Sequence, residues 1–409
     1  MSHFKYFKEK LFIEKVSVLD IAKKNKTPFY LYSSKQIEEN YVNFAKVFRN
    51  VNPLICFAAK ANTNLTLMRM LGKLGSGADV VSGGELLKAL KAGIKPNKIV
   101  FSGVGKTEEE LKLAIKNKIL LINVESESEA ILINKIGKKI SQVISIGFRI
   151  NPNVDAKTHK KISTGKAENK FGISIKNFST FYKNIKKYKN LKINAVSVHL
   201  GSQILSDTPF KKTLDILSKV IKNLNIKLKF VDLGGGFGIS YSKKDKQINL
   251  NNYAKLVYNF KKKLNCNIIF EPGRSLVGNT GILVSKIQYI KKGLNKNFVI
   301  IDAGMNDFMR TALYDANHDI VPIVKTYKKT QKPIEFVGPI CETTCKFIKY
   351  KKYQKIKEGD FIAITDAGAY GASLSSNYNT RPLIAEILAS KNYFKIIRKK
   401  QDLLKLINS

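Results

Sequence analysis

A lysine, Lys60, stands at the end of an apolar run that begins at Pro53, where a buried strand would release its last side chain into a pocket. Desolvation at such a place disfavours the ammonium form, so a lysine there can attack a carbonyl carbon and hold it as an imine. The alternative is a strand-end lysine whose head group reaches water. The residues that share a site with Lys60 decide between the two.

A glycine triplet after a later apolar run could bind a phosphate. Gly234, Gly235 and Gly236 leave successive backbone N–H groups uncovered by side chains, which suits a phosphate dianion. The segment lacks the third glycine of the dinucleotide-binding pattern, and a tight turn without a ligand is the alternative. Pro272–Arg274 offers a second exposed backbone after the next run, so two neighbouring strands could hold one phosphate.

Two further side chains could complete such a site. Glu271 closes an apolar run and needs a cationic or N–H partner, either Arg274 or Arg149 in a salt bridge or a protonated heterocyclic nitrogen. His199 also follows an apolar run, where it could fill the core or lie flat on an aromatic ring. An amine, a phosphate cradle, a ring-stacking histidine and a buried glutamate together describe a site for pyridoxal 5′-phosphate.

The elements that must position these residues form a repeat of strand and helix. Eight short apolar runs recur, and most are followed by a polar or glycine-rich turn and a stretch with helical spacing. The runs are Leu54–Ala58, Ala78–Val81, Ile99–Phe101, Leu120–Val124, Val143–Ile150, Ala195–His199, Phe230–Leu233 and Ile268–Glu271. Eight such units predict an α/β fold with a parallel (β/α)8 TIM-type barrel, whose functional side chains gather at the carboxyl ends of the strands.

After residue 277 the pattern changes to alternating runs, such as Ile282–Ile290 and Phe298–Asp302. This predicts a second, mostly β domain built from residues 278–409 and 1–33, beside a barrel over residues 34–277. Part of the segment between the fifth and sixth strands, residues 153–172, is expected to form a loop over the strand ends.

Composition limits the classes of function. The formal net charge of the 409 residues is +41, but basic pairs are scattered along the whole chain, which is typical of solvated helix faces rather than a nucleic-acid groove. The longest apolar runs are strand-sized, so no membrane span is expected, and the N-terminal segment lacks the apolar stretch of a secretory signal, which favours the cytoplasm. The four cysteines favour neither a disulfide framework nor a zinc site, and no metal is expected.

Six motifs together resemble those of the diaminopimelate decarboxylase family. They are Phe57–Asn62, His199–Gln203, Gly234–Gly238, Glu271–Arg274, Gly338–Glu342 and Asp366–Tyr370. The resemblance extends from about residue 27 to residue 388, with the motifs in the family's order. It implies a fold type III enzyme that uses pyridoxal 5′-phosphate, with a barrel like that of alanine racemase.

The resemblance also implies roles for residues around the cofactor. Lys60 would form the imine, Glu271 would face the pyridine nitrogen and His199 would stack on the ring. The cofactor contacts would further include Asp79, Ser202, Gly234, Gly235, Gly236, Gly273, Arg274 and Tyr370. A glutamate at the ring nitrogen favours decarboxylation over racemisation, because the related racemases place an arginine there.

For the substrate, the resemblance implies contacts with the end that is not decarboxylated. Arg310 and Tyr314 resemble the carboxylate contacts and Glu342 the ammonium contact, with Arg274 and Tyr370 completing the site. The alternative for Arg310 is an inter-domain salt bridge.

The resemblance implies that Cys341 is the proton donor, in a loop that reaches the active site of the partner subunit in a homodimer. From composition alone, the alternative is that Cys341 is a small buried side chain.

The expected reaction converts meso-2,6-diaminopimelate to L-lysine and carbon dioxide, the last step of lysine biosynthesis. A sibling decarboxylase of ornithine, arginine or carboxynorspermidine is one alternative, and a non-catalytic carrier of the cofactor or a basic binding protein is the other.

Overall fold

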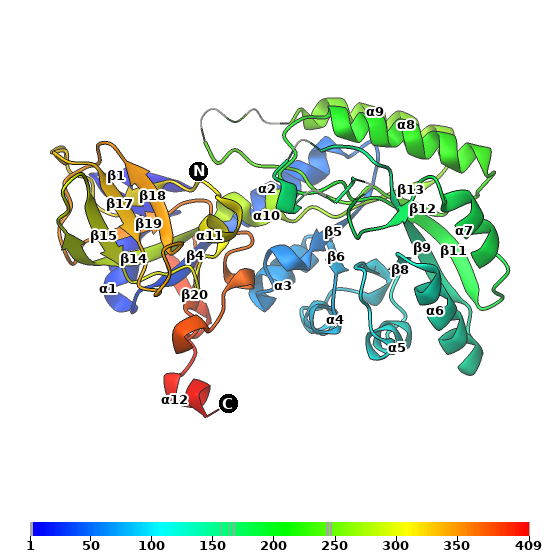
Figure 1. Ribbon diagram of the computed structural model, residues 1–409, viewed down its shortest axis with the longest axis horizontal. Helices are drawn as coiled ribbons and strands as arrows, with labels where there is room; N and C mark the ends of the chain where they lie inside the picture. Colours follow the sequence, from blue (N-terminus) through cyan, green and yellow to red (C-terminus); the bar gives the residue numbers. More distant parts are fainter. Residues whose placement is uncertain are drawn as a thin grey trace. The chain divides into compact units, whose positions relative to one another are not determined.

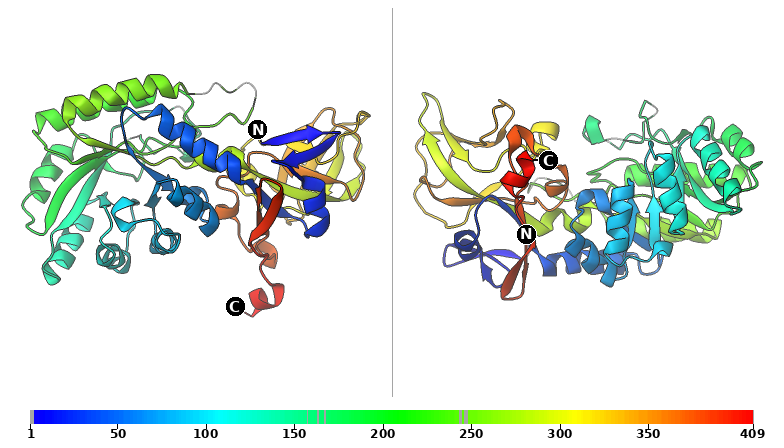
Figure 2. Two further views of the ribbon diagram at one scale, coloured as in Figure 1. Left: turned by 180° about the vertical axis from the view of Figure 1, so that it is seen from behind. Right: turned by 90° about the horizontal axis from the view of Figure 1, so that it is seen from below.

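The computed structural model describes residues 3–156, 158–162, 164–166, 168–242, 245 and 248–408. The chain forms two compact units (Figures 1 and 2). Residues Tyr41–Ile239 and Lys246–Ser275 make up the barrel unit. Residues Met1–Asn40, Ser240–Asp245 and Leu276–Ser409 make up the sheet unit.

Eight parallel strands close into a ring in the barrel unit. They are β5 (Leu54–Ala58), β6 (Gly77–Val80), β7 (Ile99–Phe101), β8 (Leu121–Val124), β9 (Ile144–Asn151), β11 (Leu191–Ser197), β12 (Phe230–Asp232) and β13 (Asn267–Phe270). Each strand pairs with the next in this order, and β13 pairs with β5. The predicted barrel and its eight strands are confirmed, with strand ends shifted by no more than four residues. A short strand that was not predicted, β10 (Ile173–Ser174), pairs with β9.

Helices follow most of these strands, as the repeat predicts. They are α3 (Leu65–Lys73), α4 (Gly83–Lys91), α5 (Glu108–Lys116), α6 (Glu127–Lys139), α7 (Phe178–Ile185), α8 (Thr208–Asn223) and α9 (Leu250–Leu264), with α2 (Ser34–Val47) before β5 and α10 (Arg274–Val277) after β13. Polar side chains cap the starts of several of them, because Asn64, Ser82, Thr107, Ser126 and Asn249 each accept an N–H of the first helical turn. These caps fix where the chain leaves each strand, which is where the candidate site residues stand.

The sheet unit is mostly β, as predicted. Its strands are β1 (Phe4–Phe7), β2 (Lys10–Ile13), β3 (Val16–Ser17), β4 (Phe29–Ser33), β14 (Gly281–Lys291), β15 (Asn297–Ile301), β16 (Ile320–Pro322), β17 (Ile334–Val337), β18 (Lys346–Tyr350), β19 (Phe361–Ile364), β20 (Ala385–Ser390) and β21 (Tyr393–Arg398). Three short helices accompany them, α1 (Val18–Lys24), α11 (Arg310–Tyr314) and α12 (Leu403–Ile407). The N-terminal strand β4 lies between β14 and β20, so the two ends of the sequence build one sheet.

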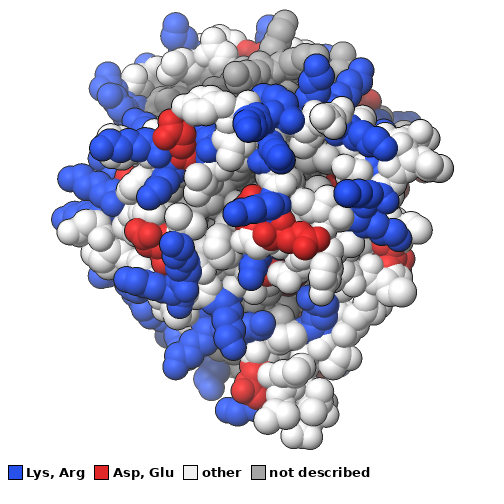
Figure 3. Space-filling model, turned by 90° about the vertical axis from the view of Figure 1, so that its left-hand side faces the viewer, with Lys and Arg blue, Asp and Glu red and all other residues white. Residues whose placement is uncertain are grey.

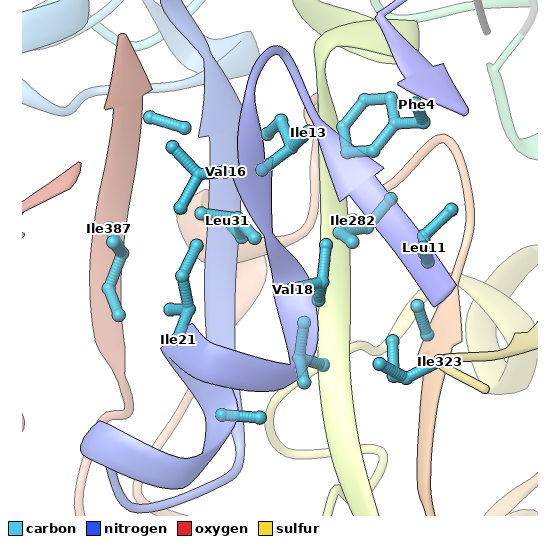
Figure 4. Close-up of a cluster of buried hydrophobic side chains, with 14 of the residues drawn as sticks. Phe4, Leu11, Ile13, Val16, Val18, Ile21, Leu31, Ile282, Ile323 and Ile387 are labelled. Atoms are coloured by element: carbon cyan, nitrogen blue, oxygen red, sulfur yellow. The ribbon is translucent and has the colours of Figure 1, made fainter. Parts of the chain in front are cut away.

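A cluster of buried aliphatic side chains holds the N-terminal segment to this sheet (Figure 4). Ile13 and Val18 lie against Leu31, Ile282 and Ile387, which come from three neighbouring strands. Each fully buried side chain of this size contributes about 1.5–3 kcal/mol relative to an exposed one. The segment before the barrel is therefore part of the core of the sheet unit.

The surface carries many basic side chains. On the face that Figure 3 displays, lysine and arginine are spread widely and acidic side chains stand between some of them. No helix among the described residues is both long and apolar enough to cross a membrane.

Candidate active site

Lys60 lies at the carboxyl end of β5, in a 3-10 helix of one turn, Ala59–Ala61. Its Nζ atom is 2.5 Å from Oδ2 of Asp79, in the neighbouring strand β6. The carboxylate is fully buried, whereas 32% of the lysine side chain is exposed. The sequence argument expected an amine made reactive by desolvation, but the structure shows an amine beside a carboxylate that compensates its charge.

Glu271 directly follows β13 and is 4% exposed. Its Oε1 atom accepts a hydrogen bond of 3.4 Å from the hydroxyl of Ser102. Burial raises the pKa of the Glu271 carboxyl well above its usual range, and the nearby carboxylates of Asp232 and Asp79 raise it further. Arg149 and Arg274, the salt-bridge partners considered from the sequence, donate to other groups, described below.

His199 stands two residues beyond β11, and its Nδ1 atom lies 3.9 Å from Oε2 of Glu271. This contact is not an ion pair. The N–H of Gly235 donates to Nδ1 over 3.3 Å, so that nitrogen acts as an acceptor. Burial lowers the pKa of His199 well below its usual value, and the positive charges of Lys60 and Arg149 lower it further. The imidazole is therefore neutral at pH 7.

The glycine loop after β12 packs closely on its neighbours. A Cβ atom on Gly235 would stand 2.0 Å from the carbonyl oxygen of Glu271, and Gly234 and Gly236 have positive φ angles of 65° and 90°. The sequence suggested three open N–H groups. In the structure the N–H of Gly234 donates to Asp232 and that of Gly235 to His199, so two of the three have partners within the protein.

Arg274 and Ser202 bring a cation and a hydroxyl together. Nη2 of Arg274 donates to Oγ of Ser202 over 2.8 Å, and Arg274 is buried. Gly273 precedes the arginine and packs against β5 and the turn after it, since a Cβ there would meet Ala61 at 3.0 Å and Ala58 at 3.1 Å. These residues follow β11 and β13, on either side of the glycine loop.

A cavity of about 420 Å³ joins several of these groups in the barrel unit. Lys60, His199 and Glu271 line it, together with Arg149 and Phe171. Its volume is within the usual range for small-molecule sites. The segment 153–172 contributes to the wall, as the expected loop over the strand ends would; residues 157, 163 and 167 of that prediction lie outside the described residues.

Two residues at the site have contacts that sequence reasoning did not predict, although Arg149 was considered as a partner of Glu271. The guanidinium carbon of Arg149 lies over the ring of Phe171, 4.7 Å from the ring centroid. The Nη1 atom of Arg149 donates to the carboxylate of Glu125 over 2.9 Å. Its position at the end of β9 was the available signal. Asn123 donates to both Ser102 and Asp232, which links the surroundings of Glu271 to the glycine loop, and no motif marked it.

The remaining predicted residues belong to the sheet unit. Arg310 is buried in α11, where its Nε atom donates to His318 over 3.1 Å and its Nη2 atom to Tyr241 over 3.3 Å. Tyr314, partly buried, ends the same helix. These contacts lie within the sheet unit, and neither His318 nor Tyr241 was singled out from the sequence.

Cys341 and Glu342 lie in an exposed turn between β17 and β18. The N–H of Cys341 donates to Asn379, and the carboxylate of Glu342 accepts from the hydroxyl of Tyr378 over 2.6 Å. The exposure of Cys341 excludes the reading of this residue as a small buried side chain. Tyr370 is partly buried and adopts a positive φ of 56°.

The chain is similar to known proteins over nearly its whole length. Residues 34–278 match the family described as "Pyridoxal-dependent decarboxylase, pyridoxal binding domain". The diaminopimelate decarboxylase of Aquifex aeolicus is 41% identical over 403 residues, which cover 98% of this chain and 95% of that protein. The enzyme of the same name from Helicobacter pylori (strain J99) is 44% identical over 381 residues, 92% of this chain and 94% of that protein.

Solved structures agree with this result. The crystal structure of diaminopimelate decarboxylase from Helicobacter pylori in complex with L-lysine has a TM-score of 0.91 and 42% identity, and covers 95% of this chain and 98% of that one. The L-lysine complex of the enzyme from M. jannaschii has a TM-score of 0.93 and 37% identity, with 99% and 96% covered. The chain belongs to the diaminopimelate decarboxylase family of pyridoxal-dependent decarboxylases.

Proposed function

We propose that the protein removes carbon dioxide from meso-2,6-diaminopimelate and yields L-lysine, with pyridoxal 5′-phosphate as its cofactor. The observation that carries this proposal is a cavity lined by Lys60, His199 and Glu271 together, in a member of this family. The reaction completes lysine biosynthesis.

The residues of the cavity fit the cofactor. The raised pKa of Glu271 shows that its buried carboxylate lacks sufficient compensation, and a protonated pyridine nitrogen would supply the missing positive charge. The neutral His199 can lie on the ring without adding a competing cation. When bound, pyridoxal phosphate accepts into its ring the electron pair that remains after carbon dioxide leaves.

Each residue then has a defined task. Lys60 attaches the cofactor covalently, and Asp79 holds the lysine head group in place for that attachment. Glu271 holds the proton on the ring nitrogen. Ser202 and Arg274 receive the phosphate as a hydroxyl and a cation 2.8 Å apart, a pairing that gives strong hydrogen bonds to an anion.

The glycines act through their lack of side chains. We assign Gly236 a backbone contact with the phosphate, while Gly234, Gly235 and Gly273 shape the surrounding loops. Tyr370 is proposed as a further phosphate contact and a wall of the substrate site.

Residues 34–277 are proposed as the cofactor-binding domain, and residues 1–33 and 278–409 as the domain that supplies the substrate contacts. Arg310, Tyr314 and Arg274 would bind the carboxylate at the end that does not react, and Glu342 would bind the ammonium group there. A substrate without that carboxylate gives the buried Arg310 guanidinium no anion to bind, at a cost of about 1–3 kcal/mol. Ornithine and arginine are therefore expected to be poor substrates.

The active unit is proposed to be a homodimer in the cytoplasm. Cys341 would reach the active site of the other subunit and return a proton to the substrate carbon. Its exposed position suits a residue that serves a neighbouring subunit. All four cysteines are free thiols, which suits a reducing compartment.

Release of carbon dioxide from a panel of purified substrates tests the function. Diaminopimelate, ornithine, arginine and carboxynorspermidine would each be offered at equal concentration with added pyridoxal phosphate, and L-lysine would be quantified as the product. We expect diaminopimelate to give the highest kcat/KM. A preference for ornithine would assign the chain to a sibling activity, and no turnover of any substrate would reject an enzymatic role.

A further inference from the structure

Two partners on opposite sides of the ring fix the protonation of His318. A guanidinium N–H can only donate, so the Nε2 atom that faces Nε of Arg310 must accept and carries no proton. The Nδ1 atom lies 2.8 Å from the carbonyl oxygen of Thr365, which can only accept, so Nδ1 carries the proton. His318 is therefore a neutral imidazole in a single tautomer, since an imidazolium would point a second N–H at the arginine cation.

Strand pairing sets the position of His318, and neighbouring aromatic side chains pack against its ring. His318 stands two residues before β16, which pairs with β19, and the N–H of Thr365 donates to the carbonyl oxygen of Asp319 over 2.9 Å. The rings of Phe308 and Tyr241 pack edge-on against the imidazole, with centroids 4.7 and 4.8 Å away. His318 is only 2% exposed, so the imidazole cannot turn over without breaking these contacts.

We propose that His318 is a positioning residue, which orients the Arg310 guanidinium toward the carboxylate at the non-reacting end of the substrate. This inference rests on the proposed function. A hydrogen bond at Nε fixes the plane of the guanidinium, and a carboxylate then meets the terminal Nη atoms in a set direction, as bidentate contact requires. Arg310 is 4% exposed and has no solvent shell to orient it instead.

The effect belongs to binding rather than chemistry. The carboxylate that Arg310 receives is remote from the bond that breaks, so a loosened guanidinium weakens the hold on the substrate before and during the reaction alike. Loss of His318 is therefore expected to raise KM and to leave kcat nearly unchanged.

Two substitutions separate orientation from packing. His318→Leu fills the space but cannot accept from Arg310, whereas His318→Gln extends an amide oxygen toward the position of Nε2. We expect His318→Leu to raise the KM for diaminopimelate at least about tenfold with kcat within about threefold, and His318→Gln to recover most of the loss. His3→Leu is the matched control, because His3 bonds Glu39 and is expected to leave both constants unchanged.

An unchanged KM in His318→Leu, or a glutamine variant no better than the leucine variant, would overturn the inference. Wild-type protein that fails to turn over diaminopimelate would instead reject the proposed function. Nitrogen-15 NMR of histidine-labelled wild-type protein gives a readout that needs neither turnover nor a folded variant. A neutral His318 with its proton on Nδ1 at pH 7 supports the proposal, and the other tautomer or an imidazolium contradicts it.

Discussion

The ion pair between Lys60 and Asp79 sets the state of the amine before any cofactor arrives. Because the carboxylate is fully buried and the lysine is partly exposed, the pair compensates Asp79 at least as much as it orients Lys60. Removing the lysine would leave Asp79 buried beside Glu271, whose pKa the Asp79 charge already raises. Lys60 therefore has an electrostatic role in addition to the chemical role that we propose for it.

Lys60→Ala is expected to abolish covalent attachment of pyridoxal phosphate and to lower kcat at least about a thousandfold. Borohydride reduction followed by mass spectrometry of the peptides checks the attachment directly. Lys88→Ala is the matched control, since this lysine is exposed and donates to the hydroxyl of Thr63. Reduced cofactor on another lysine of the Lys60→Ala variant would refute the assignment of the anchor.

The raised pKa of the buried Asp307 carboxyl predicts how the stability of the sheet unit depends on pH. Burial raises the pKa of its carboxyl from 3.8 to about 6, although the N–H of Gly304 lowers it in part. Between these two values the folded state binds more protons than the unfolded state, so stability falls as the pH rises from about 4 to about 6. The full effect is on the order of 3 kcal/mol.

Asp307→Asn cannot titrate, so the melting temperature of the wild type should fall relative to that of the variant as the pH rises through this range. Thermal unfolding at several pH values between 4 and 7 measures the difference. The exposed Asp315, replaced by Asn in the same way, serves as the control and should follow the wild type. A difference that stays constant or grows with pH would contradict the burial argument.

At the scale of elements, the turn after β12 joins the site to the barrel. The carbonyl oxygen of Gly234 accepts the N–H of Glu271 over 2.7 Å, and Gly235 packs directly against the carbonyl of the same residue. The glycine loop thus fixes the backbone of Glu271 as well as any phosphate contact. A side chain at Gly235 would disturb both at once.

Gly235→Ala is expected to destabilise the barrel unit by roughly 2–4 kcal/mol, because the new Cβ would stand 2.0 Å from a backbone oxygen that must move. Cofactor affinity should fall with it. Denaturant unfolding and titration with pyridoxal phosphate measure the two effects. Gly84→Ala, whose Cβ meets nothing closer than 3.8 Å, should change stability by no more than about 1 kcal/mol. Equal behaviour of the two variants would disprove the close packing of the loop.

The sequence predicted elements better than contacts. Each barrel strand is an apolar run bounded by polar or glycine residues, and that local signal fixes both its position and the residue that follows its end, as at Lys60 and Glu271. The use of the Gly234 and Gly235 N–H groups could not be predicted, because their acceptors, Asp232 and His199, are defined only by side-chain rotamers and by a neighbouring strand.

Across the whole molecule, contacts between distant segments could not be predicted from the sequence either. Arg310 was recognised from its motif, but its partners come from residue 241 and residue 318, and the acceptor of His318 comes from residue 365. The pairing of β16 with β19 brings residue 318 close to residue 365. A single sequence, interpreted without an alignment, contains no local pattern that predicts such pairing.

The proposed dimer leads to a prediction at this largest scale. If Cys341 serves the site of the other subunit, Lys60→Ala and Cys341→Ala remove complementary parts of one active site. Cys341→Ala alone should bind the cofactor normally and turn over about a hundredfold more slowly. Cys345→Ala is the control for the thiol, since Cys345 is buried and accepts the N–H of Met305.

Mixing these two impaired variants and allowing their subunits to exchange should raise the activity well above that of either one alone. Half of the randomly reassembled dimers would contain one of each chain, and each of these would hold one intact site from two, so about a quarter of the wild-type rate is expected. The rate of carbon dioxide release during exchange, with each variant alone as the baseline, measures the recovery. A mixture that stays at the baseline while mass spectrometry shows mixed dimers would mean that Cys341 acts within its own subunit or does not act at all.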